Sequence, residues 1–310
     1  MAQADIDEDE ELFAIPRDLV LSTHNSKLKD LLSQDLDQLG PWLSLMLVMI
    51  FEYLQGDKSI WAPYFKILPQ NFDTLMFWSP EELEELQGSA VLEKIGKQGA
   101  EESILEFIVP VVRANPALFP PVNGLASYDG DVGAQALLGL AHTMGSLIMA
   151  YAFDIETLEN EDEREGEDGY LTDEEEQSSK GMVPLADMLN ADAHRNNVSI
   201  IGNAHYFFFS FINSTNLFQA RLFQEEESLV MKAIKPIRAG EEIFNDYGEI
   251  PRSDLLRRYG YVTDNYAPYD VIELSLDTLC SSAGLSDSSI ENQPRVIHMS
   301  HKPSSLCAIG

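Results

Sequence analysis

Cysteine is almost absent from this chain of 310 residues, which contains only Cys280 and Cys307. Two cysteines supply neither a disulfide framework nor the four ligands of a structural zinc site. The histidines His142, His194 and His205 lack the spacing of metal ligands, so we expect no metal site. A chain with so few thiol groups suits a reducing compartment, and we therefore expect an intracellular protein.

Long apolar runs are missing as well. The most apolar stretch, Trp42 to Leu54, is interrupted by Ser44, Glu52 and Tyr53, which makes it too short and too mixed to cross a bilayer. No basic segment with a cleavage site precedes it, so we expect no secretory signal. The stretch fits a buried helix better, and we expect no membrane partner.

Basic residues are few, because 20 lysines and arginines stand against 52 aspartates and glutamates, a formal net charge of -32. This excess argues against direct binding of nucleic acid and favours a basic protein as the partner. Twelve acidic and two basic residues lie within residues 156–180. This acidic tract is either a solvated, disordered loop or a strip that docks a basic substrate and speeds its encounter.

Helical periodicity dominates the first half of the chain. Residues 4–21 are typical of a polar turn followed by a short strand that Pro16 stops. From Leu28 to Leu39 leucines recur at helical spacing. Ser79 followed by Pro80 and several glutamates predicts the start of a helix. Further helices are expected over residues 42–54, 81–92, 101–112 and 134–153.

Two short motifs carry most of the functional information. The first, residues 183–190 (VPLADMLN), begins as a buried segment. It ends in polar Asp187 and Asn190, an arrangement that suits aiming an amide into a cleft.

The second motif, residues 240–248 (GEEIFNDYG), follows a turn. It predicts a short strand over Glu242 to Phe244 that the chain leaves through turn residues. Tyr247 is thereby placed at the end of a strand, where a side chain can enter a pocket. A core tyrosine with a satisfied hydroxyl would give the same pattern when taken alone.

Together with residues 251–262 (PRSDLLRRYGYV), the two motifs resemble the SET-domain protein lysine methyltransferases. The chain is most similar to the class of the Rubisco large-subunit methyltransferases, and its Asn190-Ala191-Asp192 continuation is closest to the fungal ribosomal lysine methyltransferases. The resemblance implies an α+β fold. We expect a SET-domain β-fold of short strands with a large α-helical insert, plus the start of a truncated helical C-terminal lobe.

The resemblance also implies how the chain is divided. The expected segments are an N-terminal SET segment (1–27), a helical insert (28–155), an acidic loop (156–180), a C-terminal SET segment (181–263) and the start of a substrate-binding lobe (264–310). The family's Gly-x-Gly turn, whose backbone holds the methionine part of the cofactor, would lie before Met1. We therefore expect that turn to be missing. Because residues 281–310 show little helical periodicity, we also expect most of the lobe to be missing.

Residues 198–219 interrupt a junction that the resemblance predicts to be continuous. The aromatic run 206–211 has the β-propensity of a strand. Our preferred hypothesis is a retained intron, because the 22 residues begin with valine and end with glutamine. Codons for these residues can carry the letters of splice sites.

The activity implied by the resemblance is transfer of a methyl group from S-adenosylmethionine to a lysine of a basic, ribosomal protein, with the nucleus favoured over the cytoplasm. Such a displacement needs alignment and exclusion of water but no metal. Tyr247 would be the catalytic residue, with its hydroxyl orienting the amine. The resemblance assigns cofactor binding to Asn190, Ala191, Tyr151 and Tyr247, although Tyr151 also fits a core position on a helix.

Three further residues match substrate-binding positions of the family. Asp187 would line the lysine channel, although a helix cap explains it equally well. Tyr259 and Tyr261 would wall the channel, because aromatic faces accept an ammonium group, but core packing accounts for them too. A non-catalytic chain that only binds a basic protein remains an alternative, as does an unstable fragment of a faulty gene model. The sequence assigns no oligomeric state.

Overall fold

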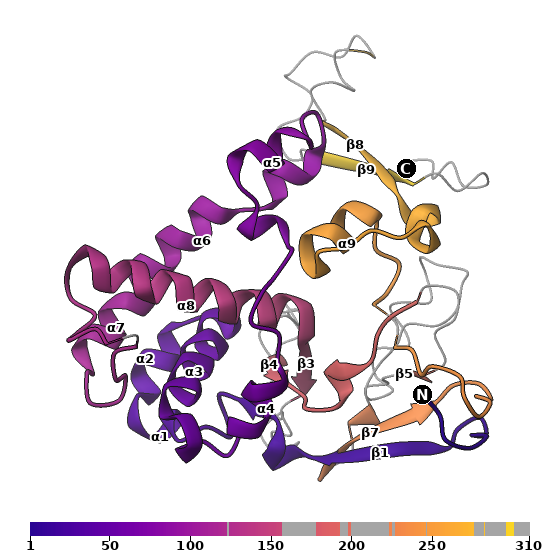
Figure 1. The fold of residues 1–310 in the computed structure, drawn as a ribbon, viewed down its shortest axis with the longest axis horizontal. Helices are drawn as coiled ribbons and strands as arrows, with labels where there is room; N and C mark the ends of the chain where they lie inside the picture. The colour runs from indigo at the N-terminus through magenta and orange to yellow at the C-terminus, as the bar shows by residue number, and fades with distance from the viewer. Residues whose placement is uncertain are drawn as a thin grey trace, which may run out of the picture. The chain divides into compact units, whose positions relative to one another are not determined.

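A computed structural model gives the fold of the chain (Figure 1). It describes residues 1–122, 124–156, 178–192, 198–199, 223–224, 227–245, 247–275, 282 and 296–300. The acidic tract is therefore described only at its edges, and of the proposed intron segment only Val198 and Ser199 are described. Most of both regions lies outside the described residues.

The chain divides into two compact units. Unit 1 contains residues 1–72 and 97–247, and unit 2 contains residues 73–96 and 248–310. The segment boundaries expected from the sequence remain predictions.

In the described part of unit 1, helices contain more residues than strands do. They are α1 (Leu28–Leu31), α2 (Ser33–Gln38), α3 (Pro41–Gln55), α4 (Ala62–Ile67), α6 (Lys97–Ser103), α7 (Val109–Ala114) and α8 (Gly130–Tyr151). Helix α3 confirms the predicted buried helix, since it begins at Pro41 and every residue from Ser44 to Glu52 is buried. It packs beside α8, and the two helices form the centre of the larger hydrophobic core (Figure 1).

Helix α8 is long and apolar enough to cross a membrane by length and composition alone. Core helices pass the same test, so this is weak evidence. Leu137, Ala141, Met144 and Leu147 of this helix are buried in the core.

Several predicted helices have different bounds in the structure. The helix predicted over 81–92 ends at Glu84 (α5, Pro80–Glu84), and a 3₁₀ turn, η4 (Ala90–Lys94), follows after left-handed Gly88. The helix predicted over 101–112 is split by a π-helical turn, η5 (Ile104–Ile108), just before Pro110, which has no N–H to donate.

The other two differences concern helix ends. Helix α8 ends at Tyr151 because Ala152 begins strand β3 (Ala152–Glu156). The leucine-rich stretch 28–39 forms two short helices, with Leu32 outside helical geometry between them. Tertiary packing, rather than spacing of apolar residues, decides both ends.

Two sheets complete unit 1. One pairs β1 (Glu11–Pro16) with β7 (Ser228–Ala233), which also pairs with β5 (Val198–Ser199) and β6 (Phe223–Gln224). The first strand thus lies antiparallel to one from late in the chain, indigo beside orange in Figure 1. The other sheet has the order β2-β4-β3, with β2 at Leu21–Ser22 and β4 at Ser178–Met182. Strand β4 leads directly into the first motif.

A buried carboxylate in α3 shows how this fold satisfies an interior charge. Glu52 is 5% exposed, and each of its two oxygens accepts a hydrogen bond of 2.6 Å, one from the Ser26 hydroxyl and one from the Ser59 hydroxyl. Both acceptors are therefore paired, as buried polar groups usually are.

Unit 2 contains α5, η4, a 3₁₀ turn η3 (Leu75–Phe77), helix α9 (Arg252–Tyr259), a 3₁₀ segment η11 (Asp264–Tyr269) and the hairpin pair β8 (Val271–Ser275) and β9 (Val296–Ser300). The predicted start at Ser79 is confirmed, because its side chain and that of Glu82 form a reciprocal capping box. Helix α9 ends at Gly260, whose φ of 78° is the left-handed conformation that glycine adopts without strain.

The packing around Gly181, in β4, leaves no room for a larger side chain. A Cβ added there would lie 2.7 Å from Val20 Cγ1 and 3.0 Å from Ile155 Cγ1, both on neighbouring buried residues. Gly181→Ala should therefore lower the free energy of unfolding by about 1 to 3 kcal/mol, measured by thermal or urea denaturation.

Gly139→Ala is the matched control, because its Cβ would meet nothing within 4 Å on the exposed side of α8. This change should raise stability slightly through helix propensity. Equal effects of the two substitutions would contradict the packing explanation.

Candidate functional site

The two sequence motifs meet in unit 1 through main-chain contacts. The Asn245 N–H donates to the Asn190 carbonyl at 2.7 Å, and Ala191 forms a parallel bridge with Asn245. The Asn190 side-chain amide also donates to Glu242 Oε1 at 2.8 Å. Tyr247, which is half-buried, follows two residues after Asn245. The two motifs are therefore in contact through their backbones.

The predicted strand over Glu242 to Phe244 is wrong. These residues form no strand, and only Asn245 makes a single bridge. Main-chain hydrogen bonds at separate points hold the second motif instead of a strand ladder: Asn245 bonds to Asn190, and Gly240 and Glu241 bond to Ala2. Ile243 and Phe244 have the β-propensity of a strand, but here they are half-buried and buried without a partner strand.

The first motif turns sharply after strand β4. Met182 and Val183 are buried, as predicted, but Leu185 is exposed and adopts a left-handed φ of 76°. Such a backbone is strained for leucine and persists only where its surroundings require it. The 3₁₀ turn η8 (Ala186–Met188) follows, and the Asp187 N–H donates to the Val183 carbonyl at 3.3 Å. This turn carries the Asp187 side chain into the interior.

Asp187 is a buried carboxyl with unequal oxygens. Its side chain belongs to a residue only 7% exposed. The Tyr64 hydroxyl, from α4, donates to Oδ2. Oδ1 is buried and accepts no hydrogen bond among the described residues. An unpaired buried oxygen of this kind is costly to stability and therefore calls for an explanation, of which a bound ligand is one.

The surroundings shift the ionisation of this group. Burial raises the pKa of Asp187 to about 7, while the hydrogen bond from Tyr64 opposes that rise. The pKa of Tyr64 lies far above its usual value, because the phenol is buried and faces the carboxylate. Burial also raises the pKa of Tyr151, and the nearby negative charge of Asp187 adds to the effect. A shifted carboxyl beside two phenols is a candidate functional site.

Tyr64 is absent from the residues predicted from the sequence. It lies 123 residues from Asp187 along the chain, within the short helix α4. Pro63 near the start of α4 and the Trp61 indole N–H, which donates to the Leu19 carbonyl at 2.9 Å, fix this helix. The segment Trp61-Ala62-Pro63-Tyr64 is a recognisable helix start, but nothing in it names a partner for the phenol.

Comparison with known proteins identifies the family. The model of the SET domain matches residues 1–248. The chain belongs to the SET-domain family. Two curated relatives are ribosomal lysine N-methyltransferase 4 of Saccharomyces cerevisiae, 35% identical over 289 residues, and the N-lysine methyltransferase setd6 of Xenopus laevis, 32% identical over 269 residues. These alignments cover 90% and 84% of this chain but 52% and 50% of the relatives, so the chain spans about half their length.

Solved structures show the same SET-domain fold. The SET domain of LSMT bound to lysine and AdoHcy superposes with a TM-score of 0.62 at 20% identity, covering 97% of this chain and 60% of that one. Rubisco LSMT bound to AdoMet gives a TM-score of 0.62 at 21% identity, covering 96% of this chain and 58% of that one. The mixed helical and antiparallel architecture therefore confirms the predicted α+β SET-domain fold.

The SET-domain structure brings some of the predicted site residues together. Asn190 and Ala191 meet Asn245 near Tyr247, and Tyr151 lies within electrostatic range of Asp187. The helix-cap explanation of Asp187 fails, because no side-chain cap bond is made at η8 and the carboxyl pairs with Tyr64 instead. The individual roles of these residues remain predictions. No group of three or more potential metal ligands occurs in the part of the chain that the structure describes.

Tyr259 and Tyr261 belong to unit 2, at the end of α9 and just beyond it. Their ring centroids are 6.5 Å apart at an interplanar angle of 60°, an edge-on contact, and Tyr261 is 39% exposed. Their predicted part in a lysine channel stays a prediction.

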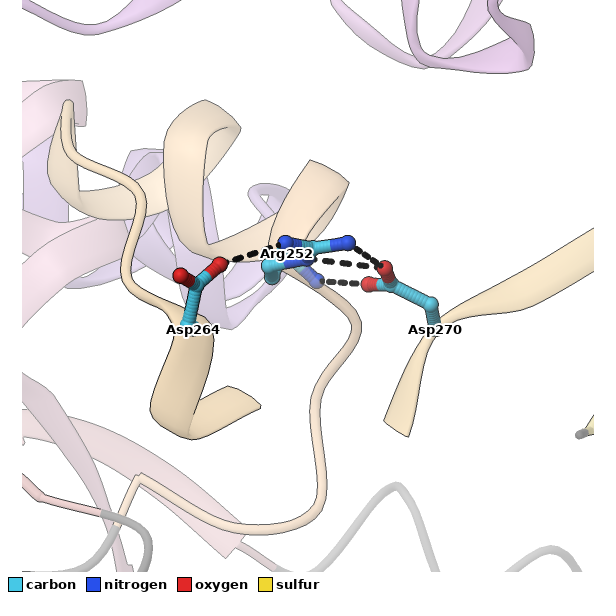
Figure 2. A network of polar contacts seen from close by, with 3 residues as sticks. All are labelled: Arg252, Asp264 and Asp270. Atoms are coloured by element: carbon cyan, nitrogen blue, oxygen red, sulfur yellow. Dashed lines mark hydrogen bonds and ion pairs between the residues drawn. The ribbon is translucent and has the colours of Figure 1, made fainter. Parts of the chain in front are cut away.

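Arg252 fixes the start of α9 within unit 2 (Figure 2). Its backbone N–H and Nε donate to Asp270 at 2.9 and 2.8 Å, and another guanidinium nitrogen lies 2.6 Å from Asp270. A further nitrogen contacts Asp264 at 2.9 Å, but the side chain of Asp264 is 97% exposed. Burial would raise the pKa of Asp270, but the hydrogen bonds from Arg252 outweigh it and hold that pKa below its ordinary value.

Asp187 predicts a characteristic dependence of stability on pH. Because its pKa is raised from 3.8 to about 7, the folded state keeps a proton that the unfolded chain has already lost between these values. Stability should therefore fall as pH rises through this window. Relative to wild type, Asp187→Asn should gain up to about 4 kcal/mol between about pH 4 and pH 7, with no further gain above it.

Chemical denaturation at a series of pH values measures this difference. Asparagine keeps an acceptor for the Tyr64 hydroxyl, so the comparison isolates the charge. A difference between the two proteins that does not change with pH would contradict the raised pKa.

The Arg252 network predicts a contrast between its two carboxylates. Asp270→Asn should speed amide hydrogen exchange at the start of α9, since it weakens several bonds at once. Asp264→Asn should leave exchange unchanged, because a single exposed ion pair contributes little. Exchange that responds equally to both changes would show that the network is held in another way.

Proposed function

We propose that this SET-domain protein is an S-adenosylmethionine-dependent protein-lysine N-methyltransferase that acts on a basic protein. The observation that carries the proposal is the pairing of Asn245 with Asn190, which joins the two motifs of a SET domain close to Tyr247. The names of the curated relatives, both lysine N-methyltransferases, support the same activity.

The residues of unit 1 fit a cationic cofactor. Asn190, Ala191, Tyr151 and Tyr247 would hold S-adenosylmethionine, and the oxygen-rich setting agrees with its positive sulfonium. The unpaired buried oxygen of Asp187, in electrostatic range of Tyr151, supports a site that receives a cation. When bound, the cofactor would supply a methyl group already activated for displacement.

The protein's own contribution is alignment and electrostatics. The Tyr247 hydroxyl would orient the lysine amine. Its oxygen would also accept a weak C–H···O hydrogen bond from the polarised methyl group. Asp187 would receive the ammonium end of the substrate lysine. The attacking amine must be neutral, and desolvation beside a positive sulfonium lowers its pKa.

The negative charge of the protein favours a basic protein as the substrate. A net charge of -32 attracts basic proteins and speeds their encounter with the enzyme. We propose a ribosomal protein as the target, a choice supported by the name of the yeast relative. The same proposal places the protein inside the cell and favours the nucleus, in keeping with the scarcity of cysteine.

Tyr247→Phe tests the proposed chemistry. Removing the hydroxyl should lower methyl transfer from labelled S-adenosylmethionine onto purified ribosomal proteins by about 100-fold or more, because one positioned polar group is lost from the transition state. Tyr128→Phe is the matched control, since its hydroxyl donates to the Pro120 carbonyl at 3.2 Å within the helical core. Its transfer rate should equal that of wild type.

Two results would contradict the proposal. Wild-type protein that labels neither ribosomal proteins nor other basic proteins, such as histones, would exclude the activity. Tyr247→Phe with full activity would exclude the assigned role of the phenol. Label on histones but not on ribosomal proteins would retain the activity and reject the finer substrate.

A further inference from the structure

The carboxyl of Asp187 is held on one side only. Both oxygens of the other buried carboxylate, Glu52, accept hydroxyl hydrogen bonds, so this fold is able to satisfy such a group completely. At Asp187 the phenol of Tyr64 takes Oδ2, and Oδ1 has no partner among the described residues. The difference marks Oδ1 as an acceptor that the described part of the chain leaves available.

The geometry fixes which oxygen stays unpaired. The main chain of Asp187 is tied to the Val183 carbonyl, and the turn before it passes through strained Leu185. On the opposite side, Tyr64 is 5% exposed and sits on α4, which Trp61 anchors to Leu19. With both partners fixed, the phenol sets the rotation of the carboxyl group.

We propose that Tyr64 is a positioning residue for Asp187, whose phenol holds one carboxylate oxygen so that the other is presented to the ammonium group of a substrate lysine. This inference rests on the proposed lysine methyltransferase function and adds a residue to its site.

The phenol also sets the charge of the carboxyl. The described ionisable groups that face Asp187 are Tyr64 from α4 and Tyr151 from the end of α8, and neither is basic. Burial therefore favours the neutral acid and raises the pKa, while the hydrogen bond from Tyr64 and a smaller contribution from the main chain of Asp187 itself favour the carboxylate. Only the carboxylate attracts an ammonium ion strongly, so the phenol keeps the acceptor competent near neutral pH.

Tyr64→Phe separates positioning from simple packing, because it removes one oxygen and keeps the ring. Loss of the hydrogen bond should raise the pKa of Asp187 and move the acidic limb of the kcat/KM profile upward by about one pH unit. Tyr128→Phe loses a comparable buried hydroxyl and should keep the wild-type profile. Asp187→Asn, which cannot ionise, should lack the limb.

A direct titration gives a readout that does not depend on turnover. The side-chain carboxyl carbon of Asp187 can be followed by ¹³C NMR of aspartate-labelled protein and assigned by comparison with Asp187→Asn. It should titrate about one pH unit higher in Tyr64→Phe than in wild type. If Tyr64→Phe does not fold, 3-fluorotyrosine at position 64 keeps the hydroxyl and makes it a stronger donor. The titration should then move to lower pH.

The outcomes distinguish this inference from the function on which it rests. An unchanged Asp187 titration in Tyr64→Phe, or in the fluorinated protein where only that folds, would overturn the positioning role even if methyl transfer is intact. A shifted titration in a protein without methyl transfer would support the Tyr64–Asp187 coupling and reject the lysine substrate. A shifted titration together with a shifted kcat/KM profile is the expected result.

Discussion

One backbone hydrogen bond, from the Asn245 N–H to the Asn190 carbonyl, organises this site. The two motifs that it joins are separated by strands β5 to β7 and by residues outside the described part of the chain. Because Glu242 to Phe244 form no strand, no ladder of further pairs supports the contact. The interaction between Asn190 and Glu242 adds a second link at the same place. These two links join the motifs just before Tyr247, while main-chain hydrogen bonds between Ala2 and residues Gly240 and Glu241 hold the start of the second motif.

The second feature of this site is the buried carboxyl of Asp187, whose burial costs stability. An isolated charge is costly to bury, and a group in that position either finds partners or keeps its proton. Asp187 is intermediate: it accepts one hydrogen bond from the Tyr64 phenol, and its pKa is raised to about 7, so that it keeps its proton over a wider pH range. Glu52, paired at both oxygens, represents the structural alternative in the same fold. The stability given up at Asp187 is the kind of cost expected at a site shaped for a ligand rather than for folding.

The sequence predicted those features whose causes are local. The all-round apolar run of α3 and the Ser79–Glu82 capping box are visible in neighbouring residues, and both are present in the structure. The resemblance carried by the two motifs led to the SET-domain fold and to Asp187 and Asn190. The sequence could not reveal Tyr64, because its role arises from a contact across 123 residues. The wrong strand at Glu242 to Phe244 has a related cause, since half-burial gives the same pattern with or without a partner strand.

The pairing of β1 with β7 has a consequence for how the protein is made. Strand β1 leaves the ribosome early, and its partner β7 is translated about two hundred residues later. The helices of residues 28–151 contain mostly local contacts and can form while translation continues. Until β7 has been made, the backbone hydrogen-bonding groups of β1 have no partner strand, and another extended chain can pair with them. Six acidic residues within positions 5–11, at and just before this strand, give nascent copies a shared negative charge that keeps such edges apart.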